Sequence, residues 1–166
     1  FMRRISHRGH REHRGRKRLI FLLISAVSVA NFGCGVPNLE SAECTESRSV
    51  VRELYSFHFG HDMQPSTENI ELRSRFLTSA FKQFIQNRYT SGVGAKVADE
   101  FTKTVTDLPK AFRVGKCTVN DSKNQAEFEV LLFWKDDERN DQRVLQVVTI
   151  KEGNRWLVGD INLLPR

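Results

Sequence analysis

The last third of the chain has the apolar periodicity of β-strands. In "QAEFEVLLFWK", residues 125–135, every second residue (Ala126, Phe128, Val130, Leu132 and Trp134) is apolar, and the residues between them are Glu127, Glu129, Leu131, Phe133 and Lys135. A period of two places successive side chains on opposite faces of a sheet. The stretches "FRVGKCTV", "RVLQVVTIKE" and "RWLVGDINLL" also read as strands, and short connections such as Gly153-Asn154 force antiparallel neighbours. We therefore predict a meander of three to four strands.

The preceding residues have the period of helices. Apolar or weakly polar side chains recur at the i, i+3, i+4 spacing of an amphipathic helix, at Val50, Val51, Leu54, Phe57 and His58. Ser47 or Thr45 can cap the start of this helix, and Gly60 can end it. Two more helices are predicted between Pro65 and Gly92, joined near Thr78. Helices followed by an antiparallel sheet indicate an α+β fold, in which N-terminal helices pack on a curved sheet to form a cone.

The basic excess of the chain is confined to its first eighteen residues. Residues 1–30 hold eight of the 26 Lys and Arg but only one of the 20 Asp and Glu, so the rest of the chain is nearly neutral. A nearly neutral body argues against nucleic acid as a partner. The charged run precedes the uncharged "LIFLLISAVSVA", residues 19–30, which is the order of a secretory signal. As a helix this segment reaches only about 18 Å, too short to cross a bilayer.

Two processing sites are compatible with this leader. Small residues at Ser28 and Ala30 suit ordinary signal peptidase, whereas Gly33-Cys34 has the form of the end of a bacterial lipobox, in which Cys34 would carry a lipid. We expect a leader over residues 1–33, a polar tether over 34–46 and a single domain over 47–166. The domain would lie in the bacterial cell envelope, either in the periplasm or anchored to the membrane through Cys34.

The cysteines leave two alternatives open. If Cys34 is lipidated, Cys44 and Cys117 form an even pair that can make a disulfide in an oxidising compartment. Alternatively, Cys117 is a buried, unpaired thiol that packs as a small apolar residue.

Four motifs resemble a family of bacterial secreted and lipid-anchored domains of unknown function in the nuclear transport factor 2-like superfamily. The motifs are "FHFGHDM", "RSRFLTSAF", "FRVGK" and "RWLVGDI", and the resemblance covers about residues 48–164. It implies a cone-shaped α+β fold and an envelope location, but no activity. One segment departs from the family pattern: "DEFTKTV" keeps Asp99, Phe101 and Thr102 and differs after them. If relatives carry a polar site in this segment, the resemblance implies that it is altered here.

The stretch "YSFHFGHDM" contains the candidate catalytic groups. His58 and His61 are three residues apart and can share a helix face, and either could act as a general base with Asp62 or Asp160 as its carboxylate partner. A metal is not expected, because the chain after residue 33 has no third histidine. In the structural alternative, His58 packs beside Leu54, while His61 and Asp62 hydrogen-bond open backbone groups where the helix ends.

Aromatic and apolar residues of the sheet suggest a binding surface. Leu131 and Phe133 lie on the face that should be wetter, and with Trp134 and Trp156 they are candidates for a pocket or an interface. Superfamily members often dimerise through the sheet, so the resemblance implies a homodimer. The function expected first is non-enzymatic binding of a small ligand or an envelope protein, without a cofactor. The alternative is a small hydrolase or isomerase that uses the His/Asp pair in a cone pocket.

Overall fold

The computed structural model describes residues 40–91, 97–135 and 140–165. The predicted leader over 1–33, the lipidation site Cys34 and most of the predicted tether lie outside these residues. The chain divides into two compact units between Pro37 and Asn38, and all described residues belong to the second unit.

Three α-helices, a 3₁₀ helix and four strands follow one another along the described chain. They are α1 (Ala42–Phe59), α2 (Thr67–Arg73), η1 (Ser74–Phe76), α3 (Ser79–Ser91), β1 (Ala111–Val119), β2 (Gln125–Lys135), β3 (Asn140–Glu152) and β4 (Arg155–Leu163). The α+β prediction is confirmed.

Helix α1 begins earlier than the sequence predicted. The Ser41 side chain accepts a hydrogen bond of 3.2 Å from the Cys44 backbone N–H, which caps the helix in place of Ser47 or Thr45. Residues 42–46 are therefore helix rather than tether, and the domain start predicted at 47 is too late. The other end was predicted correctly, because Gly60 ends the helix by donating its N–H to the Ser56 carbonyl.

The next two helices are also capped by hydroxyl side chains. Ser66 accepts from the Asn69 N–H at the start of α2, and Thr78 accepts from the Phe81 N–H at the start of α3. Thr78 also donates its own N–H to the Val158 carbonyl of β4. The predicted junction near Thr78 is thus confirmed, and this junction is hydrogen-bonded to the edge of the sheet.

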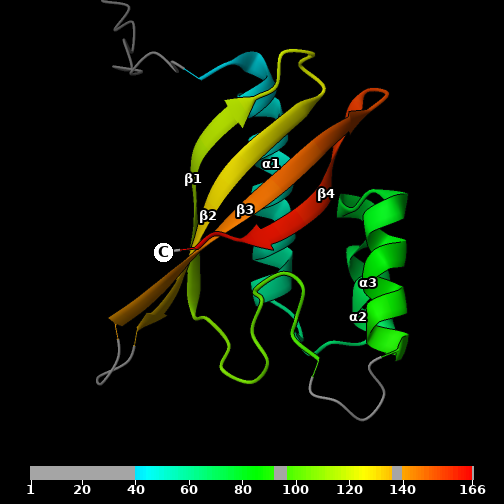
Figure 1. Cartoon of the computed structure of the whole chain (residues 1–166), viewed down its shortest axis with the longest axis vertical. Helices are drawn as coiled ribbons and strands as arrows, with labels where there is room; N and C mark the ends of the chain where they lie inside the picture. Colours follow the sequence, from blue (N-terminus) through cyan, green and yellow to red (C-terminus); the bar gives the residue numbers. More distant parts are fainter. Residues whose placement is uncertain (1–39, 92–96, 136–139, 166) are drawn as a thin grey trace, which may run out of the picture. The chain divides into compact units, whose positions relative to one another are not determined.

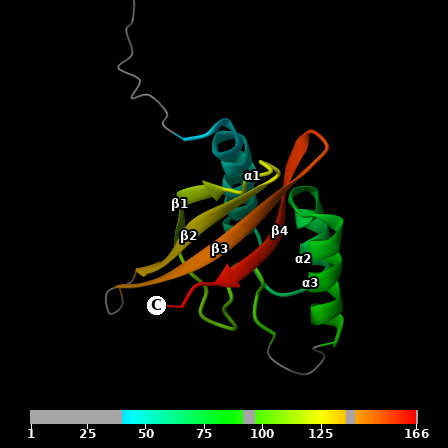
Figure 2. The same ribbon diagram turned by 45° about the horizontal axis from the view of Figure 1, so that its top comes forward.

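The four strands form one antiparallel sheet in the order β1-β2-β3-β4, as a meander requires. Figures 1 and 2 show α1 lying across one face of this sheet, with α2 and α3 beside β4. The β3–β4 connection is the predicted two-residue turn, in which Gly153 adopts a φ of 61° that glycine tolerates without strain. Register shifts in β1 and β4 add twist to the sheet.

The core lies between α1 and the inner face of the sheet. Every second residue of β2 is buried there, from Ala126 to Trp134, as the alternation predicted. Helix α1 contributes Val51, Leu54 and Tyr55 to the same core. Buried aromatic side chains, among them Tyr55 and Phe128, therefore fill the space between α1 and the sheet where the sequence placed a cone pocket.

A disulfide joins the first turn of α1 to strand β1. It links Cys44 and Cys117, one of the two alternatives that the sequence left open, across a separation of 73 residues. A cross-link of this length removes much conformational freedom from the unfolded chain.

Removal of this disulfide should destabilise the domain by about 4 kcal/mol, the chain-entropy value for a loop of this length. Urea unfolding in the presence and absence of a thiol reductant measures the loss. The Cys44→Ala/Cys117→Ala variant is the control, because its unfolding midpoint should be low and insensitive to reductant. An oxidised protein with the midpoint of the variant would contradict the prediction.

Candidate functional site

His58 lies in a buried chain of charged and polar groups rather than in an open pocket. Its Nδ1 accepts a hydrogen bond of 2.9 Å from Nε of Arg73, so the proton of the neutral ring is on Nε2. That nitrogen lies 3.1 Å from Oδ2 of Asp99 and donates to it. Arg73, His58 and Asp99 are each at most 2% exposed. Both ring nitrogens are therefore engaged, and His58 has no lone pair to offer a substrate.

The guanidinium of Arg73 donates one hydrogen bond from each of its three nitrogens. Besides His58, it donates to the backbone carbonyls of Asn69 and Asp62 at 2.6 and 2.7 Å. Burial lowers the pKa of Arg73, and the nearby charge of Asp99 opposes that shift. Asp99 balances the charge of Arg73 through the imidazole between them, without direct contact.

Residues 97–107, termed here the Asp99 segment, close the end of α1. Asp99 accepts hydrogen bonds from the Thr102 N–H and hydroxyl, and Phe101 packs on the His58 ring at a centroid distance of 4.9 Å. The Tyr55 hydroxyl donates to the Phe101 carbonyl. The three residues of "DEFTKTV" that match the family pattern are thus all buried. Residues 99–102 of the segment lie in the core rather than forming a polar surface site.

Glu100 of the same segment is also buried, at 1% exposure. Arg88 Nε lies 2.7 Å from its Oε1, an ion pair whose alignment falls short of a hydrogen bond, and Lys103 binds the other oxygen. The backbone N–H of Glu100 donates a hydrogen bond to the Tyr89 hydroxyl. The Asp99 segment is therefore fastened to α3 as well as to α1.

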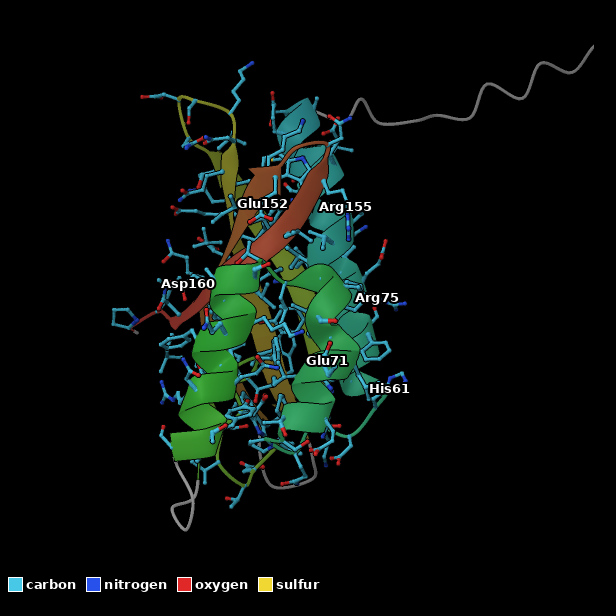
Figure 3. The ribbon with its side chains drawn as sticks, turned by 90° about the vertical axis from the view of Figure 1, so that its right-hand side faces the viewer. His61, Glu71, Arg75, Glu152, Arg155 and Asp160 are labelled. Carbon is cyan, nitrogen blue, oxygen red and sulfur yellow. A yellow bond between two sulfur atoms is a disulfide. The ribbon has the colours of Figure 1, made fainter. Side chains whose placement is uncertain are left out.

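The predicted general-base pairs are not assembled. His61 is exposed, stacks on Phe57 and donates from Nδ1 to the Phe57 carbonyl at 2.8 Å. Asp62 accepts from the Gln64 N–H, the main reason that its pKa is lowered. Asp160 binds the Ile161 N–H and the Asn162 amide in β4, and Figure 3 shows it well apart from His61. The carboxylate partner of His58 is Asp99, so the assignments to Asp62 and Asp160 are wrong and the structural alternative describes these groups correctly.

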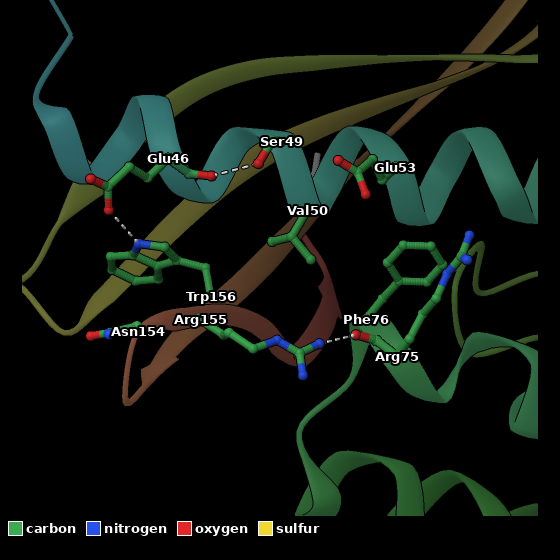
Figure 4. A pocket seen from close by; sticks show the side chains of 9 residues that line it. All are labelled: Glu46, Ser49, Val50, Glu53, Arg75, Phe76, Asn154, Arg155 and Trp156. Carbon is green, nitrogen blue, oxygen red and sulfur yellow. Dashed lines mark hydrogen bonds between the residues drawn. The ribbon is translucent and has the colours of Figure 1, made fainter.

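An open groove of about 580 Å³ lies between α1, η1 and the β3–β4 turn (Figure 4). We term it the Trp156 groove; its lining residues are Glu46, Ser49, Val50, Glu53, Arg75, Phe76, Asn154, Arg155 and Trp156. The Trp156 indole N–H donates to Glu46 at 3.1 Å. Arg155 donates to the Arg75 carbonyl, which holds the β4 wall against η1.

The charges of the Trp156 groove are segregated. Its carboxylates, Glu46 and Glu53, are on α1, whereas its guanidinium groups, Arg75 and Arg155, are on the opposite side. Arg75 lies over the Phe76 ring at 4.6 Å, so its planar face is covered while its edge can still donate hydrogen bonds. The groove can therefore hold a ligand that carries both signs of charge above an apolar floor of Val50, Phe76 and Trp156.

The structure places the four predicted pocket or interface residues in three different surroundings. Trp156 lines the groove, but Trp134 is in the core, where its indole N–H donates to the Asp107 carbonyl, so its prediction as a pocket or interface residue is wrong. Leu131 and Phe133 are half-buried on the outer sheet face, and Leu131 is paired across strands with Val144.

Sequence reasoning did not single out the charged residues of the groove or the Arg73–Asp99 connection. Glu46, Glu53 and Arg75 read as solvated helix positions, and only the packing of η1 and β4 against α1 brings them together. For Asp99, the one signal in the sequence was the resemblance of "DEFTKTV" to the envelope-domain family, which stays a prediction.

Within the described ranges, no cluster of three or more His, Cys, Asp or Glu side chains is placed to bind a metal. No helix in those same ranges has the length and hydropathy needed to span a bilayer.

Comparison with known protein families and with characterised proteins gives no match. Among solved structures, the chain is similar to the intermembrane space region of the chloroplast protein ARC6. The likeness has a TM-score of 0.45 and 16% sequence identity, and it covers 76% of this chain and 98% of the other. At this TM-score it carries no argument about the site.

Asp99→Ala should destabilise the domain by about 3–5 kcal/mol, because it leaves the buried guanidinium of Arg73 without a counter-charge. Asp99→Asn, which keeps an oxygen acceptor but not the charge, should give a smaller loss. His61→Ala is the control, and its effect should stay below about 1 kcal/mol. Urea unfolding compares the three variants, and equal losses for Asp99→Ala and His61→Ala would contradict the buried network.

Both tyrosines of the chain should resist ionisation while the domain is folded. Burial raises the pKa of Tyr55 and of Tyr89, and the charge of Asp99 adds to both shifts. Above about pH 10 the unfolded chain loses phenolic protons that the native state keeps, so the free energy of unfolding falls as the pH rises. Phenolate absorbance should appear together with the loss of circular dichroism. Reversible ionisation of either tyrosine near its ordinary pKa in the folded protein would refute this assignment.

Proposed function

We propose that the chain is an exported domain of the bacterial cell envelope that binds a ligand in the Trp156 groove without catalysing a reaction. The observation that carries this proposal is the groove itself, with carboxylates on one side, guanidinium groups on the other and aromatic rings below. Such a surface matches a segment of an envelope protein, or a small molecule, that carries both charges. The engagement of both His58 nitrogens supports binding rather than acid–base chemistry.

The location rests on two independent features. The basic and apolar leader has the order of an export signal. The Cys44–Cys117 disulfide is of a kind that persists in the periplasm and other oxidising compartments. Lipid attachment at Cys34 and membership of the nuclear transport factor 2-like family remain predictions.

A photo-reactive benzoylphenylalanine in place of Asn154, at the mouth of the groove, tests the binding proposal. Irradiation in the native host should give a covalent adduct, detected by mass spectrometry of the purified protein, whether the ligand is a small molecule or a protein. The adduct should be lost in the Arg75→Glu/Arg155→Glu background, because the guanidinium wall is then reversed in charge.

The matched control is the same replacement at Asp121, an exposed residue of the turn between β1 and β2. Equal adducts at both positions, or an adduct at Asn154 that survives charge reversal, would show that the groove is not the binding site.

We also propose that the outer sheet face mediates self-association. Leu131 and Val144 form a cross-strand pair there, with Phe133 and Val148 in the same two strands, and all four are only half-buried. Apolar side chains grouped on a sheet face are characteristic of an interface.

Leu131→Glu should convert a dimer into a monomer, because it introduces a charge at the centre of this face. Sedimentation velocity measures the change. Leu72→Glu, at an equally apolar but isolated position that is 56% exposed on α2, should remain dimeric. A wild-type protein that is monomeric at every concentration tested would rule out the dimer.

A further inference from the structure

The free edge of β1 faces a second groove, on the side of α1 away from β4. Two contiguous hollows of about 790 and 290 Å³ share Arg52 and Val114 along this junction. We term them together the β1 groove. Arg48, Arg52 and Ser56 recur at intervals of four along the helical wall of this groove. The same wall carries Glu53, and Glu40 lies beside Arg48, with which it forms an ion pair. Phe112, Arg113 and Val114 line the wall formed by the strand.

Backbone hydrogen-bonding groups of β1 point into this groove. The Lys151 N–H donates to the Asn124 carbonyl, so even-numbered residues of β2 direct their backbone groups to β3 and odd-numbered residues direct theirs to β1. Arg113 lies opposite Leu131 and is therefore bonded to β2. The N–H and C=O groups of its neighbours Phe112 and Val114 must then face the free edge.

Arg48 independently supports this orientation. Its Nη1 donates to the Val114 and Gly115 carbonyls at 3.2 and 2.8 Å, from the side opposite β2. It closes the edge at the register shift of β1 and leaves the part before it open. The Phe112 N–H and C=O and the Val114 N–H are the groups available to an added strand.

The positive charge along the free edge of β1 indicates what kind of strand can bind there. Between residues 110 and 119 there are three basic side chains, Lys110, Arg113 and Lys116, and no acidic one. Arg52 on the helical wall and Arg113 have no ion-pair partner within the described part of the chain. Cations along an edge strand repel a second copy of the same edge, and for the same reason they attract an acidic strand.

We propose that the β1 groove binds an extended acidic polypeptide segment of a partner protein, which adds to the sheet as a fifth strand beside β1. Its backbone pairs with Phe112 and Val114, and its alternating carboxylates face Arg52 on the α1 side of the sheet and Arg113 on the outer side. Main-chain hydrogen bonds supply affinity in this mode of recognition, and side-chain charges supply specificity. The proposal does not depend on the Trp156 groove.

Selection from a random peptide library displayed on phage, with the purified protein as target, tests this. Enriched peptides should be rich in Asp and Glu. Arg52→Glu/Arg113→Glu should weaken binding of the synthetic peptides by more than about tenfold, since each lost charge contact is worth that order of affinity. Arg75→Glu/Arg155→Glu, which makes the same change of charge in the Trp156 groove, should leave their affinity unchanged.

Amide hydrogen exchange separates strand addition from simple charge attraction. Bound peptide should slow exchange of the Phe112 and Val114 amides, whereas amides of β4 should not change. The proposal is overturned if acidic peptides bind without protecting these two amides. It is equally overturned if peptides enriched on the wild type bind Arg52→Glu/Arg113→Glu as tightly, or if none is enriched over that variant.

Discussion

The carboxylate of Asp99 balances the charge of the Arg73 guanidinium although the two groups are not in direct contact. Much of the domain depends on this indirect pair. The imidazole of His58 lies between them and makes one hydrogen bond to Asp99 and one to Arg73. These three residues come from the Asp99 segment, the last turn of α1 and the last turn of α2. In a low-dielectric interior, none of the three could be buried alone. The network therefore ties three distant parts of the chain into one arrangement.

This connection also positions the Trp156 groove. Arg73 ends α2, and η1, which follows directly, carries Arg75 and Phe76 into the groove wall. On the other side, the Thr78 N–H bonded to Val158 holds the same junction against β4, from which Arg155 and Trp156 project. The histidines that the sequence offered as catalytic candidates thus make structural contacts, and the lining of the Trp156 groove contains no histidine.

The two grooves lie on opposite sides of α1 and differ in character. The Trp156 groove balances carboxylates against guanidinium groups, whereas the open edge of β1 beside the other groove is predominantly basic. A helix that packs across a sheet leaves a hollow on each side, and the elements opposite the helix give each hollow its own charge. One domain of this size can therefore present two grooves of different charge.

The sequence by itself determined the elements and their order. Alternation in 125–135 predicted β2 and its buried face, Gly153-Asn154 predicted the last turn, and the junction of the two later helices was predicted near Thr78. These signals are local, because periodicity and capping involve residues only a few positions apart. The start of α1 was missed because its first turn is held by the Ser41 cap and the Cys44 disulfide rather than by an apolar repeat.

Only the tertiary structure decided which residues meet. Asp99 is 41 residues from His58, and Trp156 is 110 from Glu46. No local pattern distinguishes a carboxylate that will be buried beside a histidine from one that will be solvated, since the difference lies in what packs around it. Sequence patterns therefore predicted the sheet and the helices, but the partner of His58 and both grooves follow from how α1, η1 and the edge strands pack.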